Sequence, residues 1–233
     1  MTITTLDIIS WTTAVITAAL SIPQLFKVLK ERKTGDVNFT SFWLFELGCL
    51  LWVIFSVFST SDKGKTGEDL HFQLLNSVIA NGIGVIVTAV TIYLMYHFKK
   101  TASQKSKMFA LVGAISFIVV DIALLALYTN TNFRLSGKYL TVMGLIFPAL
   151  TTFAFFPQVL YSIKTKDYKG ISLGMFTLYT INNILWMTFW SLSMKDQGTQ
   201  LHLVGGLVWQ IISFLIYSYQ LGAGIYYLHI KKA

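Results

Sequence analysis

Seven long apolar runs, each long enough to cross a lipid bilayer as a helix, constrain the fold more than any other feature. The polar, glycine-containing stretches that separate them, such as KERKTGD and STSDKGKTGED, favour loops. A helix that crosses the hydrocarbon core needs about 20 predominantly apolar residues. The sequence therefore predicts an all-α membrane protein with seven transmembrane helices. The predicted spans are residues 7–29, 38–59, 72–97, 108–129, 139–163, 172–194 and 201–229.

Charged residues are few and unevenly placed. They make up 12% of the chain, about half the share in an average soluble domain. Thirteen of the 18 Lys and Arg residues fall on one side of the predicted membrane, and such residues concentrate on the cytoplasmic side. We therefore expect the N-terminus outside and the C-terminus in the cytoplasm of a multi-pass protein, in the plasma membrane. The net charge of +8 is interpreted as a topology signal, so no nucleic-acid partner is expected.

The chain contains an internal repeat. The Pro-Gln pair at 23–24 recurs at 157–158, and Trp52 recurs as Trp186, both at one common spacing, named here the repeat offset. Matched landmarks at equal spacing indicate a duplicated unit. Each copy crosses the membrane three times, so it ends on the opposite side from where it starts. One further span returns the chain to the starting side, and the second copy is therefore predicted to run parallel to the first. The predicted units are a first repeat at 1–98, a linker helix with flanking loops at 99–137, and a second repeat at 138–233.

The repeat motifs resemble those of the PQ-loop superfamily and, within it, the SWEET sugar transporters. GCLLWVIF and NNILWMTF are similar to the second- and sixth-span signatures, and NGIGVIVTAVTIY is similar to the third-span one. The resemblance covers nearly the whole chain. It implies two parallel three-helix bundles joined by a linker helix, and transport of a small solute. Gly48, Thr88 and Gln210 depart from the residues typical of SWEETs, which leaves the kind of solute open.

Each Pro-Gln pair lies inside a predicted helix, where we expect it to act as a hinge. Proline lacks an amide hydrogen and clashes with the carbonyl four residues back, which belongs to Ala19 in the first span and to Phe153 in the fifth. A free carbonyl in hydrocarbon costs several kcal/mol, and the neighbouring glutamine amide is the expected donor. The resemblance implies the same hinge role; the alternative is a static kink. The predicted hinge residues are Pro23, Gln24, Pro157 and Gln158.

A solute site is predicted at the interface of the repeats, near the middle of the membrane. Indole faces stack on sugars or hold cations, and carboxamides both donate and accept hydrogen bonds. Gly48 is expected to leave room in this pocket. The resemblance implies that the binding residues line it, whereas packing and helix–helix contact are the alternative roles. The predicted substrate-binding residues are Trp52, Trp186, Asn81, Gln210 and Asn182, while Asn76, Asn183 and Trp209 are interpreted as helix contacts.

Two acidic residues, Glu46 and Asp121, lie deep inside predicted spans. Ionised carboxylates are costly at that depth. Each is interpreted as a proton carrier or as a neutral, hydrogen-bonded packing group. On an ideal helix Glu46 points some 120° away from Trp52, which argues against a direct place in the pocket.

Motifs for catalysis, nucleotide binding or metal binding are missing from the sequence. The four histidines (His71, His97, His202 and His229) all lie at span ends. We therefore expect neither an enzyme nor a cofactor nor a metal site. The expected partners are a small-molecule substrate, the lipid bilayer and, as an open alternative, a second copy of the chain.

Three functions remain open from sequence alone. The leading prediction is a facilitator that moves a neutral hydroxylated solute, such as a sugar, by alternating access. The second is a proton-coupled carrier of an amino acid, a vitamin or a related metabolite. The third is a seven-helix cargo receptor. A retinal protein is excluded because its Schiff base needs a lysine in the last helix, and the run at 201–229 has none.

Overall fold

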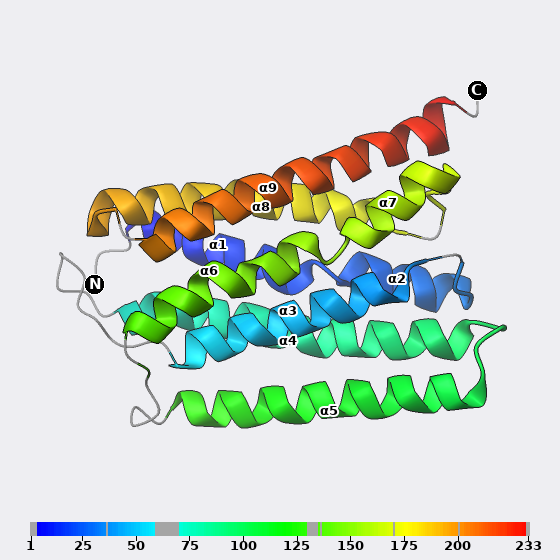
Figure 1. The fold of residues 1–233 in the computed structure, drawn as a ribbon, viewed down its shortest axis with the longest axis horizontal. Helices are drawn as coiled ribbons and strands as arrows, with labels where there is room; N and C mark the ends of the chain where they lie inside the picture. The colour runs from blue at the N-terminus through cyan, green and yellow to red at the C-terminus, as the bar shows by residue number, and fades with distance from the viewer. Residues whose placement is uncertain are drawn as a thin grey trace.

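The computed structural model is helical throughout its described secondary structure and describes residues 4–35, 37–58, 70–129, 135, 137–169, 171–199 and 201–231. Figure 1 shows the helices side by side along the long axis of the molecule. Their bounds are α1 Thr5–Ala19, α2 Ile22–Glu31, α3 Phe39–Phe58, α4 Leu70–Phe98, α5 Gln104–Tyr128, α6 Gly137–Phe153, α7 Phe156–Thr165, α8 Leu173–Gln197, α9 Leu201–Ile225 and the π-helical turn η1 Tyr226–Ile230.

Seven membrane crossings account for these helices, because α1 with α2 and α6 with α7 each form one broken crossing. Six stretches of the described residues are long and apolar enough to span a membrane. The seventh crossing, α8, has 25 residues and is therefore about 38 Å long, which is sufficient. It is more polar than the others because it carries Thr177, Thr180, Asn182, Asn183 and Thr188.

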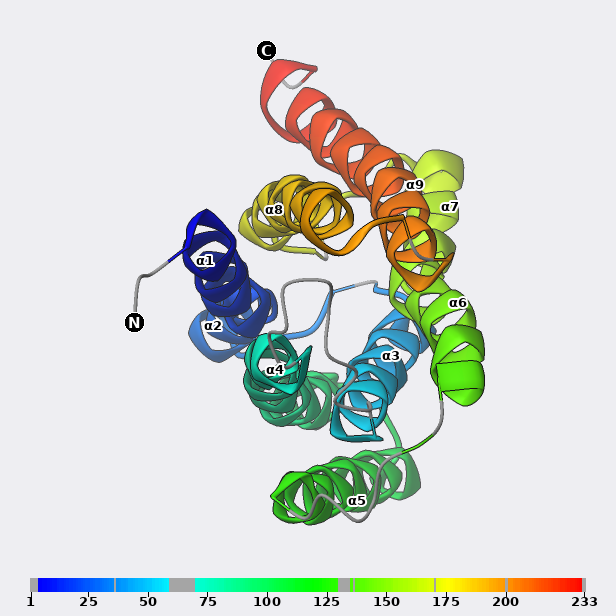
Figure 2. The ribbon, with the colours of Figure 1, turned by 90° about the vertical axis from the view of Figure 1, so that its left-hand side faces the viewer.

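Six of the crossings form a ring. Within the first repeat α4 lies between α1 and α3, and within the second α9 lies between α6 and α8. The repeats meet where α1 packs against α8 and where α3 packs against α6. Seen end-on in Figure 2, the ring therefore runs α1, α4, α3, α6, α9, α8. The prediction of two parallel three-helix bundles and a linker helix is confirmed.

The two repeats break at matching positions. In the first repeat α1 ends at Ala19 and α2 begins at Ile22; in the second α6 ends at Phe153 and α7 begins at Phe156, so both boundaries recur at the repeat offset. Both second segments carry proline in their first turn, where its missing amide hydrogen costs nothing. Both end at a residue in the left-handed conformation, Arg32 with φ 46° and Lys166 with φ 58°. The duplication therefore extends from the sequence to the backbone geometry.

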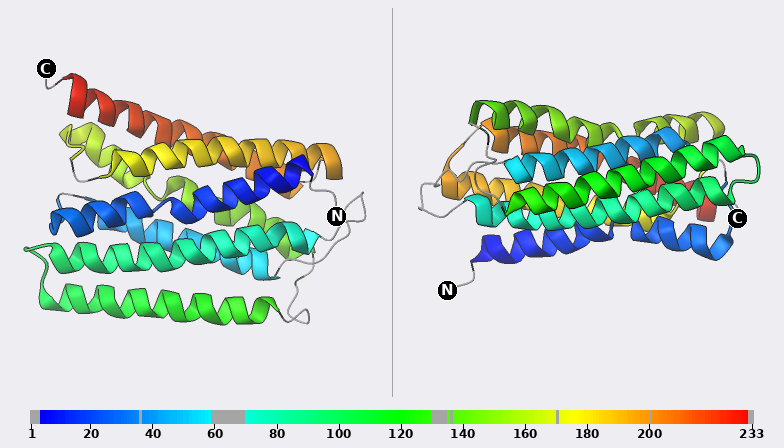
Figure 3. Two further views of the ribbon diagram at one scale, coloured as in Figure 1. Left: turned by 180° about the vertical axis from the view of Figure 1, so that it is seen from behind. Right: turned by 90° about the horizontal axis from the view of Figure 1, so that it is seen from below.

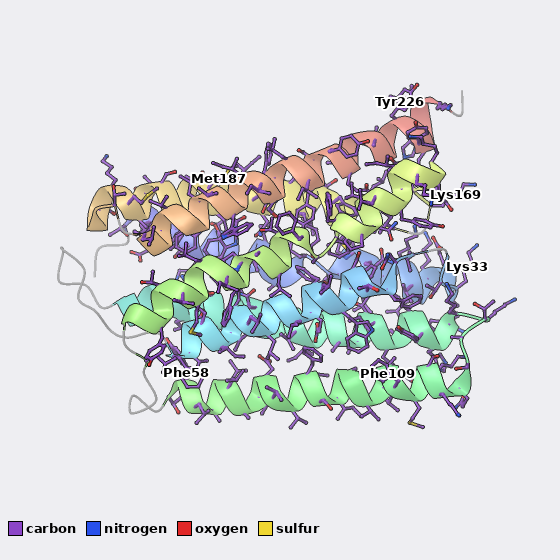
Figure 4. All side chains as sticks on the ribbon, in the orientation of Figure 1. Lys33, Phe58, Phe109, Lys169, Met187 and Tyr226 are labelled. Carbon is purple, nitrogen blue, oxygen red and sulfur yellow. The ribbon has the colours of Figure 1, made fainter. Side chains whose placement is uncertain are left out.

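The linker helix α5 packs on the outside of the ring, against α3 and α4. Figure 3 shows it along one edge of the bundle beside α4. Gly113 lets α5 approach α3 closely, because a Cβ at this position would lie 2.7 Å from the Trp43 ring. Its outer face carries large exposed apolar side chains, among them Phe109, Val112 and Val119, and Phe109 is labelled in Figure 4. This face suits contact with lipid.

Candidate functional site

A small cavity lies at the centre of the ring. Its volume is about 50 Å³, room for a few water molecules. All five predicted substrate-binding residues line it, although their binding role stays a prediction. The lining consists of Thr17, Leu20, Phe45, Cys49, Trp52, Asn81, Thr151, Thr152, Tyr179, Asn182, Asn183, Trp186, Trp190, Gln210, Ser213 and Tyr217.

The two matched tryptophans tie the repeats together across this cavity. The indole N–H of Trp186 donates to the Thr17 hydroxyl at 3.1 Å, and that of Trp52 donates to the Thr151 hydroxyl at 3.4 Å. Thr17 and Thr151 are themselves counterparts at the repeat offset. Each indole therefore bonds to the first crossing of the opposite repeat, and the arrangement is symmetric. One face of Trp186 is also covered by Trp190, with centroids 5.6 Å apart and planes 23° apart.

The three predicted carboxamides differ in how far they are already hydrogen-bonded. Asn182 Oδ1 accepts from the Thr17 hydroxyl at 2.7 Å. The Asn81 amide nitrogen donates to the Ser77 carbonyl at 2.9 Å and to its hydroxyl at 3.2 Å. Gln210 Oε1 is buried and has no hydrogen-bond partner within the described part of the chain. Gln210 therefore holds a buried carboxamide oxygen that a ligand can satisfy.

Several lining residues escaped the sequence reasoning. Asn183 was interpreted as a helix contact but lines the cavity beside Tyr179, Trp190 and Tyr217. Polarity alone could not separate it from Asn182, its neighbour in sequence. Its repeat counterpart, Cys49, lines the same cavity, but nothing in the sequence marks either position as a lining residue.

Two other intramembrane polar residues make helix contacts as predicted. The Asn76 amide donates to the Ser10 hydroxyl at 2.7 Å and joins α4 to α1. The Trp209 indole donates to the Leu145 carbonyl at 2.8 Å and joins α9 to α6. These bonds hold the third helix of each repeat against the first.

Gly48 does not enlarge the pocket, contrary to the sequence-based expectation. A Cβ at this position would lie 2.5 Å from Thr151 Cγ2 and 3.0 Å from the Thr151 backbone nitrogen. The missing side chain therefore lets α3 approach α6, and Thr151 fills the space. Contact between the repeats, rather than room for a solute, explains the glycine.

A cluster of six aromatic rings, named here the aromatic plug, closes one side of the cavity. Its centroids lie 4.7 to 6.2 Å apart in tilted and edge contacts. The plug lies between the cavity and the end of the bundle where α2 and α7 finish, named here the α2–α7 end. All six side chains are buried. The plug consists of Phe42, Phe45, Phe155, Phe176, Tyr179 and Tyr217.

The glutamines of the two Pro-Gln pairs cross-link the repeats below the plug. Gln24 Oε1 accepts from the backbone N–H of Ser172 at 2.9 Å, and Gln158 Oε1 accepts from that of Asn38 at 2.7 Å. Asn38 and Ser172 are again counterparts at the repeat offset and directly precede α3 and α8. Each glutamine therefore caps the second crossing of the opposite repeat.

The expected bond from glutamine to the carbonyl that proline frees is wrong for the second pair. The Gln158 amide nitrogen donates to the Ser162 hydroxyl at 3.2 Å instead. Beside the break, the Tyr217 hydroxyl donates to the carbonyl of Thr151. The third helix of the repeat thus supplies a donor at the break, which no local sequence pattern could reveal.

Lys27 adds a further link at the α2–α7 end. Its ammonium group donates to the carbonyls of Lys169 and Ile171, the latter at 2.9 Å. It joins α2 of the first repeat to the connection between α7 and α8 in the second. Figure 4 shows Lys33 and Lys169 at this same end, with Phe58 at the opposite end. The structure is therefore closed at its lysine-rich end.

Glu46 and Asp121 lie away from the cavity, at the interface of α3 and α4 with α5. Both side chains are fully buried, and their carboxyl oxygens have no hydrogen-bond partner among the residues described. A Cβ on Gly82 would lie 3.4 and 3.5 Å from the two Asp121 oxygens. Neither residue lines the cavity, as the helix geometry of Glu46 predicted. The alternative role, a neutral packing group held by hydrogen bonds, needs a partner for each carboxyl group, and no such partner lies within the described ranges.

A metal site is not indicated in the described ranges, since they contain no group of three or more His, Cys, Asp or Glu side chains able to hold an ion. The cavity lining likewise includes no acidic, basic or histidine side chain among its described residues. What it offers is aromatic surface, hydroxyls and carboxamides. Such a lining suits an uncharged solute.

Known proteins share both the repeat and the fold. Bidirectional sugar transporter SWEET11 of Oryza sativa subsp. japonica is 20% identical over 196 residues, which cover 84% of this chain and 59% of the rice protein. Bidirectional sugar transporter SWEET7b of the same plant is 22% identical over 213 residues, with coverages of 91% and 73%. The chain thus spans less than two thirds of SWEET11.

A shorter relative matches about a third of the chain. An uncharacterized protein of Methanocaldococcus jannaschii is 33% identical over 76 residues, which cover 33% of this chain and 82% of that protein. Among solved structures, the 3.7 Å structure of a eukaryotic SWEET transporter matches with a TM-score of 0.53 and 14% identity. The match covers 93% of this chain and 99% of that one, and it is a likeness of fold.

The family itself is identified by the duplicated unit. A sequence model described as the PQ loop repeat matches residues 5–64 and 139–198. The two segments are related by the repeat offset and together cover more than half of the 233-residue chain. This protein therefore belongs to the PQ-loop repeat family.

Proposed function

We propose that the protein is a membrane transporter that facilitates movement of a small neutral hydroxylated solute, such as a sugar, by alternating access. The observation that carries this proposal is the uncharged, aromatic and amide-lined cavity on the axis between two parallel repeats. The printed names of the rice relatives, which are bidirectional sugar transporters, favour sugars within this solute class.

The proposed cycle moves one repeat against the other. The aromatic plug, the two glutamine caps and Lys27 hold the α2–α7 end closed in this structure. The predicted hinge residues Pro23 and Pro157 stand directly after the helix breaks at 20–21 and 154–155. Bending at these breaks separates the caps and opens that end. Because the cavity is only about 50 Å³, the ring must also widen to hold a sugar.

The proposed placement follows from charge. The lysine-rich α2–α7 end faces the cytoplasm, with the N-terminus outside and the C-terminus inside, in a plasma membrane. The proposed units remain a repeat at 1–98, a linker at 99–137 and a repeat at 138–233. Because the ring is complete within one chain, we propose that a single copy forms the pathway, and that a second copy is not needed for it.

Counterflow in proteoliposomes tests this proposal. Purified protein is reconstituted and loaded with unlabelled members of a panel of sugars, amino acids, nucleosides and vitamins, and uptake of the labelled solute is followed. We expect exchange of a sugar or related polyol, and loss of at least about tenfold in rate for Trp186→Ala, which removes an indole that lines the cavity and bonds to Thr17. Binding of a solute without exchange would point to a receptor instead.

A second function, proton-coupled transport of a metabolite, is favoured by one observation. Glu46 and Asp121 are fully buried without a described partner, and an unpaired carboxylate there is costly enough to hold a proton. A proton-coupled carrier would accumulate solute against its gradient when the pH differs across the vesicle. Glu46→Gln would abolish that accumulation while sparing exchange. A facilitator, by contrast, shows equal exchange with and without the pH gradient.

A further inference from the structure

The cavity is lined by four residues that each hold a buried polar atom without a hydrogen-bond partner in the described part of the chain. These atoms are Tyr179 Oη, Asn183 Nδ2, Trp190 Nε1 and Gln210 Oε1. Each such atom destabilises the folded protein. Native proteins rarely leave several together unless a ligand or another state completes them. All four lie on α8 and α9 of the second repeat.

The first repeat presents apolar groups at two of the corresponding positions. At the repeat offset, Phe45 is the counterpart of Tyr179 and Cys49 is the counterpart of Asn183. All four of these residues line the cavity. The phenylalanine ring has no hydroxyl, and a thiol is only a weak hydrogen-bonding group. One wall is therefore polar where the other is apolar.

At the other two positions the first repeat has polar groups that are already paired. Ser56, the counterpart of Trp190, donates to the Ser77 hydroxyl at 2.9 Å. Asn81, the counterpart of Gln210 once the shorter connection before α9 is allowed for, donates its amide nitrogen to Ser77 as well. Ser77 thus binds the Ser56 hydroxyl, whose counterpart Trp190 Nε1 stays unpaired, and it anchors the Asn81 carboxamide through its nitrogen.

We propose that the second repeat supplies most of the polar recognition of the solute, through Tyr179, Asn183, Trp190 and Gln210, named here the α8–α9 subsite. The proposal rests on the proposed transport function and specifies its substrate class. Asn183 and Trp190 can only donate through these atoms, Gln210 can only accept, and Tyr179 does both. The matching solute is uncharged and carries at least two acceptor oxygens and one hydroxyl, as a monosaccharide or polyol does. Leu20, Phe45 and Cys49 form the opposite, apolar wall.

For Tyr179 the subsite makes a prediction in which stability and affinity change in opposite directions. Tyr179→Phe removes an unpaired polar atom and leaves the ring in place, so the solute-free protein keeps or gains thermal stability. Trp190→Phe also removes an unpaired polar atom, but it shrinks a buried ring, so its stability falls. Each variant also loses one hydrogen bond to the solute, so KM for exchange rises about five- to tenfold. Ser56→Ala is the matched control from the first repeat: it removes one hydrogen bond to Ser77, lowers the melting temperature and leaves KM within about twofold.

Deoxy analogues of the transported solute locate the contact on the ligand. If Tyr179 binds one hydroxyl, the analogue that lacks this hydroxyl has the same KM in the wild type and in Tyr179→Phe. The other deoxy analogues keep the five- to tenfold difference. Additive losses for every analogue would show that Tyr179 does not touch the solute.

The single cysteine of the chain separates this inference from the transport proposal. Cys49 lines the cavity, so bound solute should slow its alkylation by N-ethylmaleimide, followed by intact mass spectrometry. Protection that weakens five- to tenfold in Tyr179→Phe and Trp190→Phe supports the subsite even if no flux occurs. If exchange occurs and the KM values of Tyr179→Phe and Trp190→Phe equal that of Ser56→Ala, the subsite is overturned and the transport proposal stands. If no polyol protects Cys49 and none is exchanged, the subsite and the transport proposal are both overturned.

Discussion

At the scale of single residues, matched contacts hold the ring together. Thr17 joins α1 to α8 because its hydroxyl accepts from Trp186 and donates to Asn182. At its repeat counterpart, Thr151 receives only the longer bond from Trp52, at 3.4 Å. The two sides of the interface share a design but differ in strength, since a neutral hydrogen bond weakens with length.

This difference predicts unequal effects of equal substitutions. Thr17→Val leaves a buried indole N–H and a buried amide oxygen unpaired, so we expect a loss of about 2–4 kcal/mol in stability. Thr151→Val loses the long bond from Trp52 and a local bond to the Pro148 carbonyl within α6, and it should cost less, about 1 kcal/mol. Thermal unfolding in detergent, followed by loss of monodisperse protein, measures both. Equal melting temperatures for the two variants would contradict the assignment.

Gly48 offers a second test at this scale. Gly48→Ala places a methyl group 2.5 Å from Thr151 Cγ2 and 3.0 Å from backbone, so α3 and α6 must separate. We expect a loss of about 1–3 kcal/mol. Gly222→Ala is the matched control, because nothing lies within 4 Å of its added Cβ and alanine favours a helix. The control should melt at or above the wild-type temperature; a similar fall in both variants would refute the contact argument.

At the scale of elements, the broken crossings distinguish this bundle from a set of straight helices. The break at 154–155 separates α6 from α7, and Pro157 occupies the first turn of α7. Pro148, by contrast, lies inside the continuous helix α6. A proline at a break leaves room for bending, whereas one inside a continuous helix is held by its surroundings.

Pro157→Ala should therefore slow transport more than it weakens binding. Alanine restores an amide hydrogen and favours a continuous helix from α6 into α7, which stiffens the proposed hinge. We expect counterflow to fall at least about tenfold, with solute protection of Cys49 within about twofold of wild type. Pro148→Ala serves as the control and should lose less exchange. Normal turnover in Pro157→Ala would leave the break as a static packing feature.

The elements were largely predictable from the sequence, and their cross-contacts were not. Apolar runs long enough to span a bilayer, together with the constant repeat offset, determine the crossings and the position of each break. The partners of Gln24 and Gln158 depend on which loop the other repeat brings near, and for Gln158 the local pattern predicts the wrong acceptor. Asn183 and Gly48 were misplaced for the same reason: burial against a distant helix leaves no mark on neighbouring positions.

At the scale of the whole molecule, the two ends of the ring differ. The α2–α7 end combines the aromatic plug, two glutamine caps and Lys27, all of which join one repeat to the other. Every one of these contacts must break if that end is to open. Contacts within a repeat, such as those of Asn76 and Trp209, can persist throughout. The structure therefore predicts that the main motion is between the two repeats, and that bending inside each repeat is confined to the breaks at 20–21 and 154–155.

Cross-linking distinguishes these two kinds of motion. In a Cys49→Ser background, Lys27→Cys with Lys169→Cys places thiols on opposite repeats, where Lys27 now donates to Lys169. A short bis-methanethiosulfonate reagent should abolish exchange, and reduction should restore it. Lys166→Cys with Lys231→Cys is the control within the second repeat, since both ammonium groups lie over the Tyr227 ring at 5.6 and 5.2 Å. Cross-linking this pair should leave exchange intact, because it joins two segments of the same repeat. Unchanged exchange in both pairs would rule out opening at the α2–α7 end.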